Sequence, residues 1–254
     1  MAVIFYLSGT GNSLYAAKSI AQELEQCRLE GITGYLKAPY EVQDEVVGIV
    51  CPVYCMALPP VVEAFLQQVK MVPQYIFLVV TMGAMSGQAL GQGKELLKQR
   101  ELRLSYGAQV ALPDNSIVFP SPQARQEKLL RSAPAELGLI ARNIKNKYDN
   151  YQHLDRGFLW KYGGTAAGMW VLDKIKQFGK LSCADDKCVG CGICAEVCPA
   201  GNITMAAGKP AFGSECVHCF GCAHWCPQNA ISLGRLKPDL KTRYKHPEIT
   251  PAEL

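Results

Sequence analysis

The sequence has no long apolar run and no segment of the kind that directs a chain across a membrane. Its longest uncharged stretch, Met71–Gly93, is interrupted by Pro73, Gln74 and four glycines, which favours a buried strand and its loop over a membrane span. No positively charged leader with an apolar centre opens the chain. We therefore expect a cytoplasmic protein without a membrane span, whose cysteines are thiols or metal ligands.

Several motifs of nucleotide chemistry are also missing. The chain contains no G-x-x-x-x-G-K-[ST] and no G-x-G-x-x-G run, which argues against a P-loop and against direct use of NAD(P)H. Residues 125–180 carry 11 Lys and Arg against 5 Asp and Glu. Because no DNA-binding motif accompanies this basic excess, we expect a solvated face or a docking patch for an acidic partner, and no nucleic-acid binding.

Cysteine, in contrast, is abundant, and eight of the twelve cysteines fall into two copies of one pattern. Cys188–Pro199 and Cys216–Pro227 both have the spacing C-x2-C-x2-C-x3-C-P, which is typical of bacterial ferredoxins with two [4Fe–4S] clusters. The fourth cysteine of each run then ligates the other cluster. The spacing predicts one site formed by Cys188, Cys191, Cys194 and Cys226, and a second formed by Cys198, Cys216, Cys219 and Cys222.

A zinc ribbon is the alternative interpretation, because it also uses paired C-x2-C units. A zinc ion would leave no role for the third cysteine of each run or for the Cys-Pro pairs, so the spacing favours clusters. We expect His218 and His224, inside the second run, to cover a cluster rather than ligate it. Four further cysteines lie outside the pattern: Cys27, Cys51, Cys55 and Cys183.

The first residues suggest a phosphate site. An apolar run at residues 2–7 leads into Ser8-Gly9-Thr10-Gly11-Asn12-Ser13, and an amphipathic helical pattern follows. In α/β proteins such a strand, loop and helix hold a phosphate, because N–H groups and hydroxyls converge at the helix N-terminus. An ordinary strand-to-helix turn is the alternative. The predicted phosphate ligands are Ser8, Thr10, Gly11, Asn12 and Ser13.

The order of strand, loop and helix recurs through the first 150 residues. Further strands are predicted near residues 29–35 and at residues 45–50, 75–80 and 106–112. Helices are predicted at residues 61–69, 88–100 and 123–148. This alternation indicates a doubly wound, five-stranded parallel sheet of the α/β class, with a ligand crevice at the carboxyl ends of its strands.

Two more loops should line that crevice. The loop after the third strand offers an aromatic face and sulfur atoms to a planar ring; its residues are Pro52, Val53, Tyr54, Cys55 and Met56. The loop after the fourth strand offers backbone donors and little bulk; its residues are Thr81, Met82, Gly83 and Ala84. Neither loop holds a histidine or a pair of carboxylates, and Asp114 is the nearby acid, so we predict no catalytic residue.

Together these motifs resemble a known family. Residues 1–150 resemble the flavodoxins, whose FMN-phosphate loop is similar to S-G-T-G-N-S, and residues 182–234 resemble the two-cluster bacterial ferredoxins. The whole chain is similar to the flavodoxin–ferredoxin fusion proteins of anaerobic bacteria and archaea. The resemblance implies FMN and two [4Fe–4S] clusters as cofactors. It also implies a phosphate on the Ser8–Ser13 loop and an isoalloxazine ring against Tyr54 and the Thr81–Ala84 loop.

We accordingly expect four segments. They are a flavodoxin-like domain (1–150), a helical connector (151–181), a small α+β ferredoxin-like domain (182–234) and a surface tail (235–254). The expected function is electron transfer between FMN, the two clusters and a redox partner protein. The alternative is an FMN-dependent reductase of a small substrate, such as a quinone, a flavin or an activated carbonyl, that receives electrons through the clusters.

Overall fold

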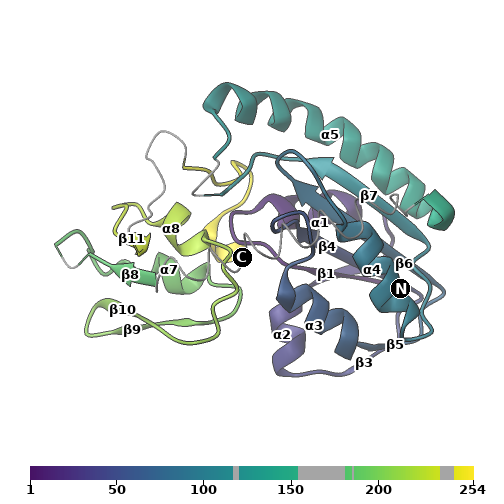
Figure 1. Cartoon of the computed structure of the whole chain (residues 1–254), viewed down its shortest axis with the longest axis horizontal. Coiled ribbons are helices and arrows are strands. Elements are labelled where there is room, and N and C mark those ends of the chain that lie inside the picture. Colours follow the sequence, from purple (N-terminus) through teal and green to yellow (C-terminus); the bar gives the residue numbers. More distant parts are fainter. Residues whose placement is uncertain (117–119, 154–180, 185, 235–242) are drawn as a thin grey trace.

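Figure 1 shows two bodies in the chain: a helix-covered sheet and a smaller module of short strands and helices. The structure is a computed structural model, and it describes residues 1–116, 120–153, 181–184, 186–234 and 243–254. The sheet and its helices are built by the described residues up to 153, and the smaller module by residues 181–234. The C-terminus lies between the two bodies in this view (Figure 1).

The sheet has five parallel strands in the order β2-β1-β4-β6-β7. The strands are β1 (Ala2–Tyr6), β2 (Cys27–Gly31), β4 (Val46–Pro52), β6 (Tyr75–Met82) and β7 (Tyr106–Ala111). From β1 the chain moves outward to β2 and then returns to the other side of β1 for β4. The strand order therefore reverses between β1 and β4, which is where doubly wound sheets bind their ligands.

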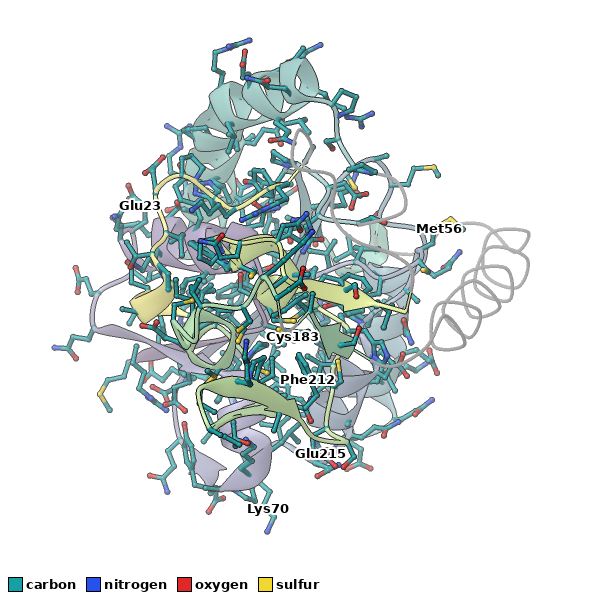
Figure 2. All side chains as sticks on the ribbon, turned by 90° about the vertical axis from the view of Figure 1, so that its left-hand side faces the viewer. Glu23, Met56, Lys70, Cys183, Phe212 and Glu215 are labelled. Atoms are coloured by element: carbon teal, nitrogen blue, oxygen red, sulfur yellow. The ribbon has the colours of Figure 1, made fainter. Side chains whose placement is uncertain are left out.

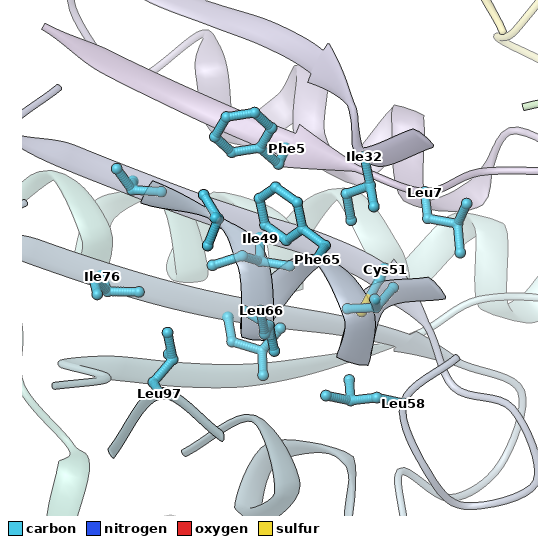
Figure 3. Close-up of a cluster of buried hydrophobic side chains, with 14 of the residues drawn as sticks. Phe5, Leu7, Ile32, Ile49, Cys51, Leu58, Phe65, Leu66, Ile76 and Leu97 are labelled. Atoms are coloured by element: carbon cyan, nitrogen blue, oxygen red, sulfur yellow. The ribbon is translucent and has the colours of Figure 1, made fainter. Parts of the chain in front are cut away.

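Helices cover both faces of the sheet. On one face lie α1 (Asn12–Ala21) and α5 (Gln123–Lys145), and on the other lie α2 (Ile32–Lys37), α3 (Pro60–Gln68) and α4 (Ala89–Lys98). Successive side chains of a strand point to opposite faces, so the central strands β1, β4 and β6 contribute to both cores, whereas the apolar side chains of β2 and β7 pack into the core beneath α1 and α5. Figure 3 shows the core beneath α3, where the rings of Phe5 and Phe65 are 4.8 Å apart. The predicted α/β architecture is confirmed.

One boundary differs from the prediction. The second strand was expected near residues 29–35, whereas β2 spans Cys27–Gly31 and the following residues form α2. Ile32 and Tyr35 lie on the buried side of this short helix, and the Tyr35 ring packs 5.2 Å from that of Phe65. A helical period brings both side chains to the core, which a strand could not do, because residues three apart point to opposite faces. The chain also forms a small parallel pair of β3 (Glu41–Val42) and β5 (Lys70–Met71).

The smaller module contains two antiparallel pairs, β8 (Leu181–Cys183) with β11 (Ile231–Leu233) and β9 (Ile203–Ala206) with β10 (Lys209–Phe212). Two short helices, α7 (Ile193–Glu196) and α8 (Gly221–Trp225), each carry the third cysteine of one run. The pairing of β8 with β11 brings the two ends of the module together, around a small core of cysteines and apolar residues. Two 3-10 turns complete the described elements, η1 (Tyr151–His153) and η3 (Pro251–Glu253).

The predicted connector, residues 151–181, lies mostly outside the described residues. Within the described parts of the chain, no helix combines the length and the apolar character that crossing a membrane requires. Residues 243–254 were expected to form a surface tail, but Tyr244, His246 and Ile249 are buried. These side chains are apolar or aromatic, and their burial stabilises a fixed course of the chain.

The central strand offers a test of the packing. Gly48 in β4 faces Phe77, and a Cβ atom added at Gly48 would lie 2.1 Å from the Phe77 ring. We expect Gly48→Ala to lower the free energy of unfolding by about 1–3 kcal/mol, because overpacking displaces the ring. Gly34→Ala in α2 is the matched control, since no atom lies within 4 Å of the added Cβ. Urea unfolding followed by circular dichroism measures both, and equal stability of the two variants would contradict this packing.

Candidate functional site

The eight cysteines of the two runs surround two cavities in the smaller module. The first cavity is lined by Cys188, Cys191, Cys194 and Cys226. The second is lined by Cys198, Cys216, Cys219 and Cys222. The structure thus brings the fourth cysteine of each run to the cavity of the other run, which is the grouping expected from the spacing. That these thiols bind clusters remains a prediction.

The two runs follow the same path around their cavities. In the first run Gly190 and Gly192, which lie on either side of Cys191, have left-handed φ angles of 71° and 78°. The equivalent residues of the second run, His218 and Phe220, also have positive φ angles, of 55° and 56°. Residues other than glycine rarely adopt this backbone conformation. Its recurrence at residues that carry a side chain indicates that the loop shape is imposed by the need to point three thiols inward.

The fourth cysteine of each run accepts a hydrogen bond from the backbone N–H four residues later. The Asn202 N–H donates to Cys198 Sγ at 3.3 Å, and the Ala230 N–H donates to Cys226 Sγ at 3.3 Å. Hydrogen bonds of this kind stabilise a thiolate and tune the potential of a bound iron–sulfur cluster. The two sites are therefore built alike down to their outer hydrogen bonds.

The chemistry of the donors fits a multi-iron core. The four thiols of each site line a cavity. Within the described residues, no three His, Cys, Asp or Glu side chains are grouped closely enough to hold one metal ion. Burial raises the pKa of Cys219 to about 12 and also raises that of Cys222. A positively charged inorganic core in contact with these thiols would offset the cost of ionising them.

A fifth thiol lies at the first cavity. Cys183 ends β8 and lines the same cavity as Cys188 and Cys226. Figure 2, in which the smaller module faces the viewer, labels Cys183 between the ribbons of this module. The motif spacing does not include this residue, because it lies five positions before the run and reaches the cavity only through the pairing of β8 with β11.

At the other body, the Ser8–Ser13 loop connects β1 to α1. Ser8, Thr10 and Ser13 are buried, and Gly11 begins the helix with a φ of 99° and no side-chain cap. The Gly11 N–H donates to Ser8 Oγ at 3.2 Å. The loop therefore gathers hydroxyls around an uncapped helix N-terminus, and both features favour an anion.

The structure brings the three predicted loops together at the carboxyl ends of the strands. The hydroxyls of Ser13 and Thr81 are 2.9 Å apart, and the Val53 N–H donates to the Thr81 carbonyl at 3.0 Å. Pro52 ends β4 and Met82 ends β6, whereas Ala84 is exposed beyond the strand. The loops that were inferred separately from sequence thus share one end of the sheet.

The third loop makes a tight turn. Cys55 and Met56 have φ angles of 47° and 68°, and Tyr54 and Ala57 exchange two backbone hydrogen bonds of 2.9 Å. The fourth loop packs against this turn, because a Cβ at Gly87 would lie 2.2 Å from the Met56 carbonyl oxygen. The two loops therefore hold each other in place.

Two buried polar groups at these loops lack partners. Among the described residues, neither the Tyr54 hydroxyl nor the Gln88 side-chain nitrogen has a hydrogen-bond partner. Gln88 lies beside the turn, since its N–H donates to the Met56 carbonyl at 2.8 Å. Buried polar groups without partners are costly, and a ligand with polar atoms along a planar edge would satisfy them. The residues at this end of the sheet therefore fit a flavin.

Asp114 follows β7 at the same end. A Cβ at Gly83 would lie 2.7 Å from Asp114 Oδ2, so this carboxyl group lies against the fourth loop. Burial raises the pKa of Asp114, an effect that the Ser116 N–H and Arg125 oppose. Burial and the nearby Asp114 both raise the pKa of Cys55.

The second cysteine run packs directly on the Ser8–Ser13 loop, which is the predicted phosphate loop. A Cβ at Gly9 would lie 2.7 Å from Cys219 Cβ, and a Cβ at Gly221 would lie 2.5 Å from the Gly9 carbonyl oxygen. The Trp225 indole N–H donates to that same oxygen at 3.1 Å. Burial and the neighbouring Cys219 and Cys216 raise the pKa of Tyr54 well above its usual value. The second cavity therefore lies next to both the phosphate loop and the third loop.

Several residues of this region were not found from the sequence. They are Gln88, Asn115, Trp225, Tyr244 and His246. Trp225 lies inside the second cysteine run but is not one of its spaced cysteines. Gln88 and Asn115 come from the first 153 residues, and Tyr244 and His246 come from the C-terminal segment. The aromatic residues near the C-terminus were the one available signal, because such residues are unusual in a solvated tail.

The chain was compared with family models, curated proteins and solved structures. Residues 174–231 match the family model of the 4Fe-4S dicluster domain. No curated protein matches the chain. Among solved structures, the two-electron reduced flavodoxin of Megasphaera elsdenii is 21% identical, with a TM-score of 0.36, and the match covers 56% of this chain and 98% of that one. The Trp repressor binding protein of Bacillus subtilis is 10% identical, with a TM-score of 0.36 and coverage of 53% and 96%.

At these scores the fold assignment rests on the strand order of the chain itself. The order β2-β1-β4-β6-β7 is that of the flavodoxins. The chain thus joins a flavodoxin-like sheet to a 4Fe-4S dicluster domain.

The fifth thiol gives a test of the ligand assignment. We expect Cys183→Ala to leave the iron content unchanged, because four thiols already complete the first site. Cys216→Ala should lose about half of the iron, since it opens the second site. Iron and sulfide analysis of anaerobically purified protein measures both, and a loss of iron in Cys183→Ala would overturn the assignment.

The buried His246 predicts a pH dependence. Burial lowers its pKa to about 4, against roughly 6.5 in an unfolded chain. The unfolded state therefore takes up a proton first, and stability falls as the pH drops from about 6.5 towards 4. We expect a loss on the order of 1–2 kcal/mol between pH 7 and pH 5 in urea unfolding. His246→Phe keeps an aromatic ring on Tyr15 but binds no proton, so its free energy of unfolding should fall less between pH 7 and pH 5. An equal loss in both proteins would contradict the neutral, buried state of His246.

Proposed function

We propose that this chain is an electron-transfer protein that holds FMN at the carboxyl ends of its strands and two [4Fe–4S] clusters in its smaller module. FMN supplies transfer of one or two electrons, and the clusters supply transfer of one. The observation that carries the proposal is the packing of Gly9 in the phosphate loop against Cys219 in the second four-cysteine site. This contact supports two adjacent binding sites, because the Ser8–Ser13 loop touches the second four-cysteine site directly.

The residues of the sheet have distinct tasks in this proposal. The loop of Ser8, Thr10 and Ser13 binds the phosphate through hydroxyls and the N-terminus of α1. The Tyr54 hydroxyl and the Gln88 side chain bind polar atoms of the ring, which would satisfy the two groups that otherwise have no partner. On the side of the second site that faces the loop, Cys219 and Trp225 lie against Gly9.

The two cysteine sites differ in exposure. Cys191 of the first site is exposed, and the neighbouring Val189 is 64% exposed. Cys219, the equivalent residue of the second run, is half-buried and lies against Gly9. This asymmetry supports an arrangement in which a redox partner protein docks at the first site while the second faces the flavin.

A reductase of a small substrate is the second candidate, and Asp114 favours it. This carboxyl group lies against Gly83 at the ring loops, and burial raises its pKa, so it is suited to hold a proton. Turnover of a quinone that falls in Asp114→Asn, with an unchanged flavin content, would support the reductase over the carrier.

The relay is tested in two stages. Anaerobic purification should yield about eight irons and one FMN per chain. Cys191→Ala should then keep FMN, lose about four irons and accept electrons from a reduced ferredoxin at least roughly tenfold more slowly, because the exposed site is opened. Cys27→Ala, a change in strand β2, is the control and should behave as the wild type. Unchanged electron uptake in Cys191→Ala would overturn the relay.

A further inference from the structure

The C-terminal segment, residues 243–254, closes a ring of hydrogen bonds around the junction of the two bodies. The Tyr244 N–H donates to His224 Nδ1 at 3.1 Å, and His224 Nε2 is 2.7 Å from the Asn115 carbonyl oxygen. Two residues before Asn115, the Pro113 carbonyl accepts the Asn12 side-chain N–H at 2.9 Å. The Tyr244 hydroxyl donates to Asn12 Oδ1 at 2.6 Å and completes the ring.

His224 is held in one orientation by this ring. Its Nδ1 accepts an N–H, so Nε2 carries the proton and donates to the carbonyl, as in a neutral imidazole. The Arg243 guanidinium donates to the His224 carbonyl at 2.9 Å and 3.2 Å. His224 lies between Cys222 and Cys226 in the second run, so the ring holds the helix that carries Cys222.

Asn12 is held in the same way at the phosphate loop. Both ends of its side-chain amide are used, one by Pro113 and the other by Tyr244. Asn12 is also the first residue of α1, where an anion would bind. The ring therefore connects a predicted phosphate ligand to the second four-cysteine run through a single tyrosine.

The rest of the segment lies along the same loop. The His246 N–H donates to the Thr10 carbonyl at 2.8 Å, and the His246 ring stacks on Tyr15 at 4.0 Å. Ile249 packs at Gly11, where an added Cβ would lie 3.0 Å from the Ile249 Cβ. Beyond it, Glu253 forms an ion pair with Lys18 of α1. The segment thus follows the phosphate loop and the first turns of α1 while its start holds His224.

From this connection we infer that residues 243–254 form a clasp through which binding of a flavin phosphate and retention of iron in the second site stabilise each other. The inference rests on the proposed function, because it needs both ligands to bind. A phosphate that orders Asn12 also orders Tyr244 and His224. A filled second site orders His224 first, and through it Tyr244 and Asn12. Such coupling is reciprocal, so each ligand must change the affinity of the other by the same factor.

The test measures both directions of the coupling with Tyr244→Phe, which removes the hydroxyl that bonds to Asn12 and keeps the ring. Tyr148→Phe is the matched control, because Tyr148 is 53% exposed and lies far along the chain from the ring. Iron release to a chelator is followed by absorbance under anaerobic conditions, with and without added FMN. The dissociation constant of FMN is measured by flavin fluorescence on iron-loaded and iron-depleted protein.

In the wild type and in Tyr148→Phe we expect FMN to slow the release of iron from the second site, which is half of the total, about fivefold. A factor of this size corresponds to the free energy of one hydrogen bond. Removal of iron should raise the dissociation constant of FMN, because the coupling acts in both directions. In Tyr244→Phe both effects should fall below about twofold. Amide hydrogen exchange of residues 243–254, which should slow when FMN binds to the iron-loaded wild type, gives a second measurement that needs no variant.

The outcomes separate the two proposals. A wild-type protein that binds no FMN or holds no iron in the second site overturns the proposed function, and the clasp with it. A wild-type protein that binds both, without any effect of one on the other, overturns the clasp alone. Equal protection by FMN in Tyr244→Phe and Tyr148→Phe also overturns it, because the direct contact of Gly9 with Cys219 would then account for the coupling.

Discussion

The close approach of Gly9 to Cys219 is the constraint on which the arrangement of the two bodies depends. A Cβ at Gly9 would lie 2.7 Å from the Cβ of Cys219, so the phosphate loop can reach the second four-cysteine site only where it has no side chain. Gly221 meets the Gly9 carbonyl from the other side under the same restriction. Trp225 then donates to that carbonyl and fixes the orientation of the two backbones.

This contact also explains why the two cysteine sites differ although their sequences repeat. In the first run Cys191 is exposed, whereas the equivalent Cys219 of the second run is half-buried against Gly9 of the Ser8–Ser13 loop. Burial disfavours the thiolate form, and it raises the pKa of Cys219 to about 12. A positively charged core bound to this site would offset the cost of ionising that thiol.

The sequence predicts the structure where local spacing decides it, and it does not where distant segments meet. The parallel sheet and the grouping of Cys198 with the second run follow from periodicity and spacing. The extent of β2 was wrong, because burial of Tyr35 against Phe65 favours a helix over a longer strand. The course of the C-terminal segment was also missed, since the sites that bury Tyr244 and His246 are contributed by other parts of the chain.

Spacing by itself therefore determined which thiols share a cavity, which loop follows the first strand and which class of sheet the chain forms. A tight loop can direct its cysteines inward whatever surrounds it, and strand and helix periods are properties of short segments. Only the tertiary structure decided that the second cysteine site faces the phosphate loop, that Cys183 joins the first cavity and that Tyr244 connects Asn12 to His224. Those relations depend on packing between segments far apart in sequence, and no local pattern encodes which surfaces will meet.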